Sequence, residues 1–187
     1  KPEFQKFLKN NIKGDEVAFG TIGDASTSEG IFWETINAAG VLQVPVAITV
    51  YDDGYGISVP VELQTTKSSI SKALQGFQKK EKTNGIDIYT GKGWDYPGLI
   101  EMYKSGIEHT RKTHIPSVFH VQELTQPLGH STSGSHERYK SEERLAWEKE
   151  FDGNAQMRKW LIEAEIADAE MLDEIEKNAA KRAKDAR

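Results

Sequence analysis

Apolar residues in this chain form short β-branched runs that alternate with longer stretches in which they recur at helical spacing. The runs predict strands and the stretches predict helices. Strands are expected over 16–22, which reads as buried, and over 44–51, 85–90 and 117–124; helices are expected over 28–42, 68–80 and 96–112. Strands that alternate with helices of this length indicate an α/β fold, a parallel sheet with helices on both faces.

The two ends of the chain have a different character. Residues 2–10 have apolar positions at helical spacing and predict the end of a helix, and a helical tail rich in Glu, Lys, Ala and Leu begins at Ser141 and is broken at Gly153. The expected organisation is an α/β domain over residues 1–139, incomplete at its N-terminus, followed by a tail and linker over 140–187. A start without methionine, almost directly inside an element, predicts a fragment.

Composition narrows the class of protein. The chain has 187 residues, 37% of them hydrophobic and 28% charged, and a net charge of -5. With no basic stripe, nucleic acid and membrane surfaces are not expected partners. No apolar run approaches the roughly 18 residues of a spanning helix, and no cysteine is present. These features predict a soluble protein, most simply of a bacterial cytoplasm.

Candidate chemistry lies in the loops that follow the first two predicted strands. Gly23, Asp24, Ala25 and Ser26 enter a helix that Ser26 or Thr27 could cap, so their amides could hold an anion such as a diphosphate. Asp24 could then bind a hard cation that bridges the diphosphate, because Mg²⁺ prefers oxygen ligands.

A second acidic pair, Asp52 and Asp53, ends the next strand, beside the first in a parallel sheet. Asp53 could reach the same cation, and a turn through Gly54 and Gly56 could present the Tyr55 carbonyl. From the residues alone, a helix cap or a plain turn is the commoner reason for such acidic positions. Ligands of parallel α/β sheets bind at this carboxyl edge, which keeps the metal hypothesis open.

The order of several motifs resembles a known family. The segments GDA, SEG, ETIN, QVPVAITV and YDDGYGIS follow one another, and the loop TQPLGHSTSGSHERY comes later. This order resembles the alpha subunit of the thiamine-diphosphate-dependent 2-oxo acid dehydrogenases, the decarboxylating first component of those complexes. The resemblance extends to about residue 175 and implies the thiamine-diphosphate-binding fold and a pyruvate or branched-chain type of enzyme.

Carried over to this chain, the resemblance implies a cofactor, a metal and partners. Asp24 and Asp53 would bind Mg²⁺ with the Tyr55 carbonyl, the amides of residues 23–26 would hold thiamine diphosphate, and His130 would assist acyl transfer beside the cofactor. The implied partners are a 2-oxo acid substrate, a beta subunit or beta-like domain, and the lipoyl domain of the acyltransferase, in an oligomer. The His-Ser-Thr-Ser loop leans toward branched-chain oxo acids.

The chain departs from the family pattern in its charge. The family usually has asparagine at Asp53 and an arginine near Gln126, so the site is about two charges more negative, with each nearby charge worth a few kcal/mol. Either another cation compensates, with Lys67, Lys92 and Arg138 as candidates, or cofactor affinity is lowered. Ala25 in place of glycine is a milder change. The isolated chain is expected to be inactive and to bind cofactor poorly.

Two alternatives stay open. One is another thiamine enzyme, of the acetoin dehydrogenase or transketolase type, because the diphosphate motif is shared. The other is a non-catalytic assembly module, which Asp53 and Gln126 favour. The remaining histidines and the tryptophans are expected to have packing, structural or solvated roles: His109, His114, His120, His136, Trp33, Trp94, Trp147 and Trp160.

Overall fold

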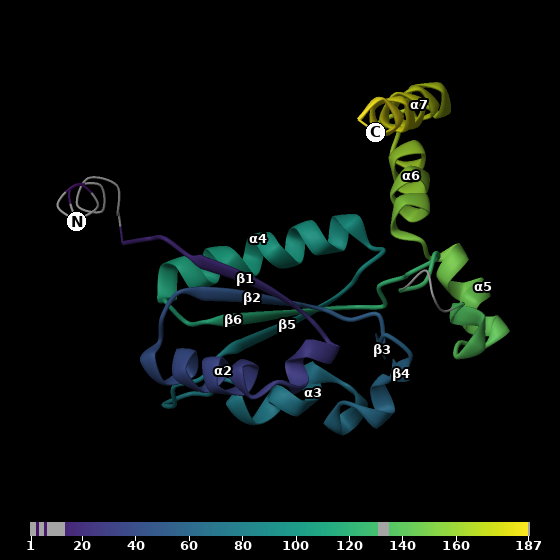
Figure 1. Ribbon diagram of the computed structural model, residues 1–187. Helices are drawn as coiled ribbons and strands as arrows, with labels where there is room; N and C mark the ends of the chain where they lie inside the picture. Colours follow the sequence, from purple (N-terminus) through teal and green to yellow (C-terminus); the bar gives the residue numbers. More distant parts are fainter. Residues whose placement is uncertain (1–2, 4–5, 7–13, 131–134, 187) are drawn as a thin grey trace.

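A four-stranded parallel sheet organises the chain (Figure 1). The computed structural model describes residues 3, 6, 14–130 and 135–186. Strand order is β1-β2-β6-β5, so the chain crosses over between strands that are not consecutive in sequence. The strands are β1 (Ala18–Gly23), β2 (Val46–Tyr51), β6 (Ser117–Gln122) and β5 (Asp87–Lys92). The parallel sheet predicted from the alternating pattern is confirmed.

Strand register brings three strand ends together. Gly23 of β1 lies opposite Tyr51 of β2, and Tyr51 lies opposite Val121 of β6. Because the strands are parallel, the loops that leave them emerge along the same edge of the sheet. The two acidic segments predicted to be neighbours, Asp24 and Asp52–Asp53, therefore follow adjacent strands.

Helices cover both faces of the sheet, as predicted. Figure 1 shows α4 (Tyr96–Thr113) on one face, and α2 (Gly30–Leu42) and α3 (Ile70–Ala73) on the other. The main core lies between α2, α3 and the sheet. Its buried members are Phe32, Ile36, Ile48, Val50, Ile70, Leu74, Ile86 and Val118. On the opposite face, Gly106 lets α4 approach the Phe119 ring closely.

Several predicted elements differ from the structure. The first strand is not buried: β1 is an edge strand with Phe19 64% exposed, because only β2 pairs with it. The helix predicted over 68–80 is shorter, since α3 ends at Ala73 and continues as a 3-10 helix. Neither Ser26 nor Thr27 caps α2, which begins after Glu29. The 3-10 helices are Ala25–Ser28, Val61–Leu63, Thr66–Ser68, Leu74–Phe77 and His136–Arg138.

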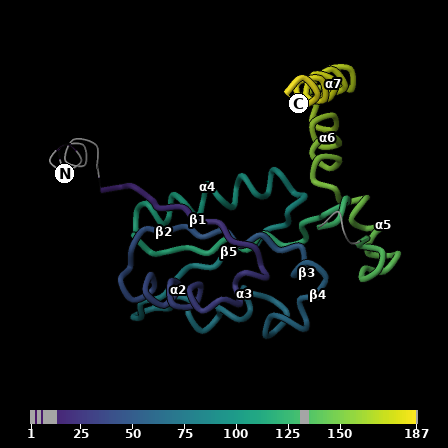
Figure 2. The backbone as a smooth tube through the Cα atoms, viewed as in Figure 1, coloured from purple at the N-terminus to yellow at the C-terminus, as the bar shows by residue number. Residues whose placement is uncertain are grey.

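The C-terminal tail is helical, as predicted. It consists of α5 (Glu142–Glu150), α6 (Gly153–Glu163) and α7 (Ala169–Asp185). Figure 2 shows α5 beside the carboxyl edge of the sheet, while α6 and α7 lead away from it. Gly153 begins a new helix there, because the Asp152 side chain accepts a hydrogen bond from the Ala155 amide.

The N-terminal helix end predicted over 2–10 lies almost entirely outside the described residues. Within the described part of the chain, no helix has the length and apolar character needed to cross a membrane. The division between residues 139 and 140 stays a prediction.

Candidate functional site

A cavity of about 590 Å³ lies at the carboxyl edge of the sheet, between the loops that follow β1, β2 and β6. Every site residue predicted from the sequence lines it, namely Gly23, Asp24, Ala25, Ser26, Asp53, Tyr55 and His130. Glu29 and Gln126 also contribute to its wall. The fold thus collects residues from three loops around one space, although their roles there remain predictions.

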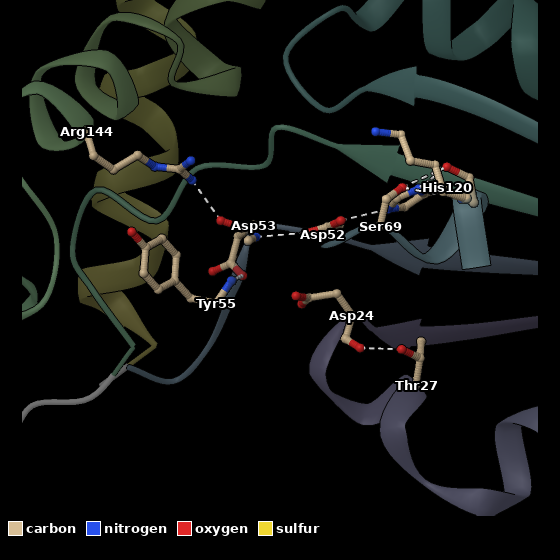
Figure 3. Close-up of polar contacts among 11 residues, drawn as sticks. Asp24, Thr27, Asp52, Asp53, Tyr55, Ser69, His120 and Arg144 are labelled. Atoms are coloured by element: carbon tan, nitrogen blue, oxygen red, sulfur yellow. Dashed lines mark hydrogen bonds and ion pairs between the residues drawn. The ribbon is translucent and has the colours of Figure 1, made fainter. Parts of the chain in front are cut away.

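Asp24 carries the strongest electrostatic signal in this cavity. Its side chain is buried, and its Oδ2 atom has no hydrogen-bond partner. Burial raises the pKa of the carboxyl from 3.8 to about 7, and the charges of Asp52 and Asp53 add to the rise. Figure 3 shows the carboxyl group pointing toward the turn that carries Asp53 and Tyr55. A divalent cation would supply the partner that this oxygen lacks, so the donors fit a Mg²⁺ site.

The turn opposite Asp24 is shaped by its own side chains. Asp52 Oδ1 accepts a hydrogen bond from the Gly54 amide at 2.8 Å, and Asp53 Oδ1 accepts one from the Tyr55 amide at 3.1 Å. Gly54 has a positive φ of 80°, which glycine adopts without steric cost. The turn then enters a two-stranded ribbon of β3 (Tyr55–Gly56) and β4 (Val59–Pro60). The backbone conformation of the turn that presents Asp53 to the cavity is therefore fixed by hydrogen bonds on both sides of that residue.

Burial is the main reason why the pKa of Asp53 is raised. The Tyr55 amide and the charge of Lys140 oppose this rise, whereas Asp52 and Glu148 add to it. Two neighbouring carboxyl groups, Asp24 and Asp53, thus resist ionisation in the absence of a cation. Burial and like charges close together disfavour the ionised form of each carboxyl, and a bound cation would reverse that effect.

The amide prediction for residues 23–26 needs one correction. The Asp24 amide donates to the Tyr51 carbonyl at 2.9 Å, which extends the pairing of β1 and β2. It is therefore satisfied within the sheet. Thr27 does not cap the following helix, since its hydroxyl donates to the Asp24 carbonyl. The Ala25 amide lies against the Asp24 carboxyl, where its hydrogen bond opposes the rise in pKa that burial causes, so the Ser26 amide is the better candidate to meet an anion.

Behind the turn lies a buried polar chain that sequence reasoning did not find. His120 of β6 is fully buried, with Nε2 at 2.7 Å from Asp52 Oδ2 and Nδ1 at 3.0 Å from Ser71 Oγ. The structural role expected for His120 is confirmed, but its partner was not predicted. The sequence pattern places His120 on β6, but it does not indicate that His120 pairs with Asp52, which follows the neighbouring strand β2.

The compensating cations proposed from the sequence are not in the cavity. Lys67, Lys92 and Arg138 are absent from the described residues that line it. Lys92 instead pairs with Glu123 at 3.2 Å and lies over the Trp94 ring. Their proposed role in offsetting the acidic charge therefore stays a prediction.

Two other cations lie beside the Asp53–Tyr55 turn, and both belong to the region of the helical tail. Arg144 of α5 donates through NH2 to the Asp53 carbonyl at 2.7 Å, and it lies over the Tyr55 ring. The Nζ atom of Lys140 lies 4.9 Å from the centroid of the same ring. Both side chains bind Glu148, at 2.7 Å for Lys140 and 2.8 Å for Arg144. The sequence analysis did not find Arg144 or Lys140, because their contacts with the turn span a long stretch of sequence.

The third loop brings Gln126 and His130 to the cavity. His130 is exposed there, and Gly129 before it has a positive φ of 70°. Residues 131–134 of the GHSTS motif lie outside the described part of the chain. The neutral Gln126 lines the cavity together with three acidic residues, Asp24, Glu29 and Asp53. The predicted excess of negative charge at the site rests on this lining.

Side chains alone do not form a metal centre here. Among the residues that the structure describes, no group of three or more His, Cys, Asp or Glu could hold a metal ion. Two carboxylates and a carbonyl are what the Mg²⁺ prediction requires, because Mg²⁺ commonly takes one or two carboxylates and fills its shell with phosphate oxygens and water.

Comparison with known proteins gives the family. The dehydrogenase E1 component model matches residues 7–187. The pyruvate dehydrogenase E1 component subunit alpha of Rickettsia bellii is 25% identical over 172 residues, covering 92% of this chain and 50% of the relative. The 2-oxoisovalerate dehydrogenase subunit alpha of Bacillus subtilis is 28% identical over 168 residues, covering 87% and 48%.

A third relative agrees with the other two. The pyruvate dehydrogenase E1 component subunit alpha of Acholeplasma laidlawii is 30% identical over 185 residues, covering 87% of this chain and 50% of the relative. The chain spans about half the length of the curated relatives it matches. The resemblance stated from the motifs is confirmed: this chain belongs to the dehydrogenase E1 component family.

Proposed function

We propose that this chain is the cofactor-anchoring part of a thiamine-diphosphate-dependent 2-oxo acid dehydrogenase, and that it holds the cofactor through Mg²⁺. The observation that carries the proposal is the buried Asp24 carboxyl, which has an unpartnered oxygen and faces the Asp53–Tyr55 turn across a cavity. Relatives named as pyruvate and 2-oxoisovalerate dehydrogenase subunits support this class of reaction.

Each residue of the cavity has a distinct task in this proposal. Asp24 and Asp53 bind Mg²⁺ with their carboxylates, and Tyr55 contributes its carbonyl oxygen. The loop of residues 23–26 holds the diphosphate, chiefly through the Ser26 amide. When bound, thiamine diphosphate supplies the chemistry by which a 2-oxo acid loses carbon dioxide. His130, exposed at the cavity, holds and moves a proton during acyl transfer.

The whole protein needs more than this chain supplies. Its proposed partners are a beta subunit or beta-like domain, and a lipoyl domain that receives the acyl group in an oligomeric complex. The substrate is a 2-oxo acid of the pyruvate or branched-chain type. We expect the 187-residue chain alone to be inactive, and we propose residues 1–139 as the anchoring domain, with 140–187 as a helical tail and linker packed on it through α5 (Figure 2).

The test uses the full-length protein assembled with its partner subunit. Release of carbon dioxide is measured from a panel of 2-oxo acids that differ in side chain, and binding of thiamine diphosphate with Mg²⁺ is measured by calorimetry. Asp24→Ala should abolish both, whereas Asp173→Ala on the exposed part of α7 should change neither. Cofactor binding without carbon dioxide release would favour a transketolase-type enzyme.

A different outcome would favour the non-catalytic alternative. If the assembled protein binds no thiamine diphosphate, and Asp24→Ala leaves partner assembly unchanged, the sheet serves as an assembly module. That pair of results would refute the proposed function.

A further inference from the structure

Helix α5 contacts the turn of residues 52–55, called the acidic turn below, although 91 positions separate Arg144 from Asp53 in the sequence. The Arg144 guanidinium group uses two of its nitrogens for different partners. Nε donates to Glu148 Oε1 at 2.8 Å, and NH2 donates to the Asp53 carbonyl at 2.7 Å. Figure 3 shows Arg144 reaching this carbonyl from the side of the tail helices. Because the guanidinium group is planar and rigid, it fixes the direction of both hydrogen bonds and also places a positive charge beside the turn.

Glu148, the residue that anchors Arg144, is itself buried and hydrogen-bonded. Glu148 is 1% exposed, and its Oε1 atom accepts hydrogen bonds from both Arg144 and Lys140. The guanidinium group also contacts two aromatic rings, with its carbon 5.5 Å from the Tyr55 centroid and 4.8 Å from that of Trp147. The side chain therefore has little freedom to leave the Asp53 carbonyl.

Both sides of one peptide unit are pinned by this arrangement. The carbonyl of Asp53 accepts from Arg144, while the amide of Gly54 in the same peptide donates to Asp52 Oδ1 at 2.8 Å. Asp52 is itself fixed by His120 at 2.7 Å. Gly54 has no Cβ to restrict it, so an unpinned peptide at this point could rotate at low cost. If this peptide lost both bonds, the backbone angles of the turn could change, and the Asp53 carboxyl would then shift relative to the Tyr55 carbonyl.

We infer that Arg144 is a positioning residue of the metal-binding turn, by which the helical tail fixes the peptide between Asp53 and Gly54 in the orientation that binds Mg²⁺. The inference rests on the proposed function and names a residue of the same site. Lys140 and Glu148 act through Arg144, as a second cation and as the shared anchor.

Selectivity between two cations separates positioning from simple charge. Mg²⁺ requires nearly ideal octahedral geometry, whereas Ca²⁺ accepts variable coordination. A loosened turn should therefore weaken Mg²⁺ more than Ca²⁺. Loss of one positive charge beside the site would instead alter both affinities in the same direction by similar factors.

The experiment uses the full-length protein assembled with its partner subunit. Apparent Kd values for Mg²⁺ and for Ca²⁺ are measured by calorimetry with saturating thiamine diphosphate. Arg144→Gln removes the fork and the charge, and Arg144→Lys keeps a cation beside Glu148, which protects folding. Arg158→Gln is the matched control, because Arg158 forms ion pairs with two carboxylates in the tail, away from the turn.

We expect both Arg144 variants to raise the Kd of Mg²⁺ about tenfold or more, the scale of a hydrogen bond from a charged donor. The Kd of Ca²⁺ should change by less than about threefold, and the control should match the parent protein. Equal weakening of both cations, or normal Mg²⁺ binding in Arg144→Lys, would overturn the inference. A parent protein that binds neither cation would instead refute the proposed function.

Discussion

Asp24→Asn is expected to stabilise the metal-free chain while removing its metal site. The carboxyl is 4% exposed, and its pKa in the folded chain is raised from 3.8 to about 7, first by burial and then by Asp52 and Asp53. The folded state therefore binds this proton more tightly than the unfolded state. Stability is full below pH 3.8, falls as pH rises toward 7 and stays low above it.

The size of the effect follows from the same shift. A tenfold change in proton affinity corresponds to about 1.4 kcal/mol, so ionising Asp24 costs the folded chain up to about 4 kcal/mol at pH 8. Asparagine keeps a similar shape and an oxygen that can accept a hydrogen bond, but it carries no charge. At pH 8 the variant should therefore be more stable than the parent by up to about that amount, and the difference should disappear near pH 4.

Urea unfolding followed by tryptophan fluorescence measures the difference, in EDTA buffers between pH 4 and pH 8. Asp173→Asn is the control, because its carboxyl is exposed in α7 and any effect of its removal should not follow this pH course. Adding Mg²⁺ with thiamine diphosphate to the full-length protein should raise the stability of the parent alone. A variant that is less stable than the parent at pH 8 would show that burying the ionised Asp24 carboxylate does not destabilise the folded chain.

Glu148→Ala should lower the free energy of unfolding by about 3–5 kcal/mol, because it leaves the Lys140 ammonium buried without its partner. Chemical denaturation measures this loss, and the double variant with Lys140→Met should recover part of it. Gly40→Ala should raise stability by up to about 1 kcal/mol, since a methyl group there meets α2's neighbours no closer than 3.6 Å. Gly106→Ala should lower it by about 1–3 kcal/mol, because its methyl group would lie 2.5 Å from the Phe119 ring. Equal shifts in Tm for the two glycine variants would contradict this account of the packing.

Local patterns were sufficient to predict the sheet and the edge where the site lies. Runs rich in β-branched residues such as 46–50 favour strands, and the alternation with helices favours parallel pairing. Asp24 and Asp53 could be placed together because each follows a strand directly. That placement rested on the tendency of successive strands to be neighbours in a sheet.

Features that depend on long-range packing could not be predicted in the same way. The apolar run at 16–22 gave no information on strand order, so the edge position of β1 was missed. Arg144 and Lys140 reach the acidic turn only because α5 packs beside the sheet, across a long stretch of sequence. The start of α2 was also misplaced, because the Thr27 hydroxyl binds the Asp24 carbonyl instead of capping the helix.

The outer side of β1 has a consequence for handling the protein. In the described part of the chain this strand pairs with β2 alone, and its sequence AFGTIG contains neither a charged residue nor proline. Natural sheets commonly use such residues to prevent strands of separate molecules from joining. Without that protection, concentrated solutions of the isolated chain should aggregate through intermolecular β-pairing, and a lysine at the exposed Phe19 should delay it.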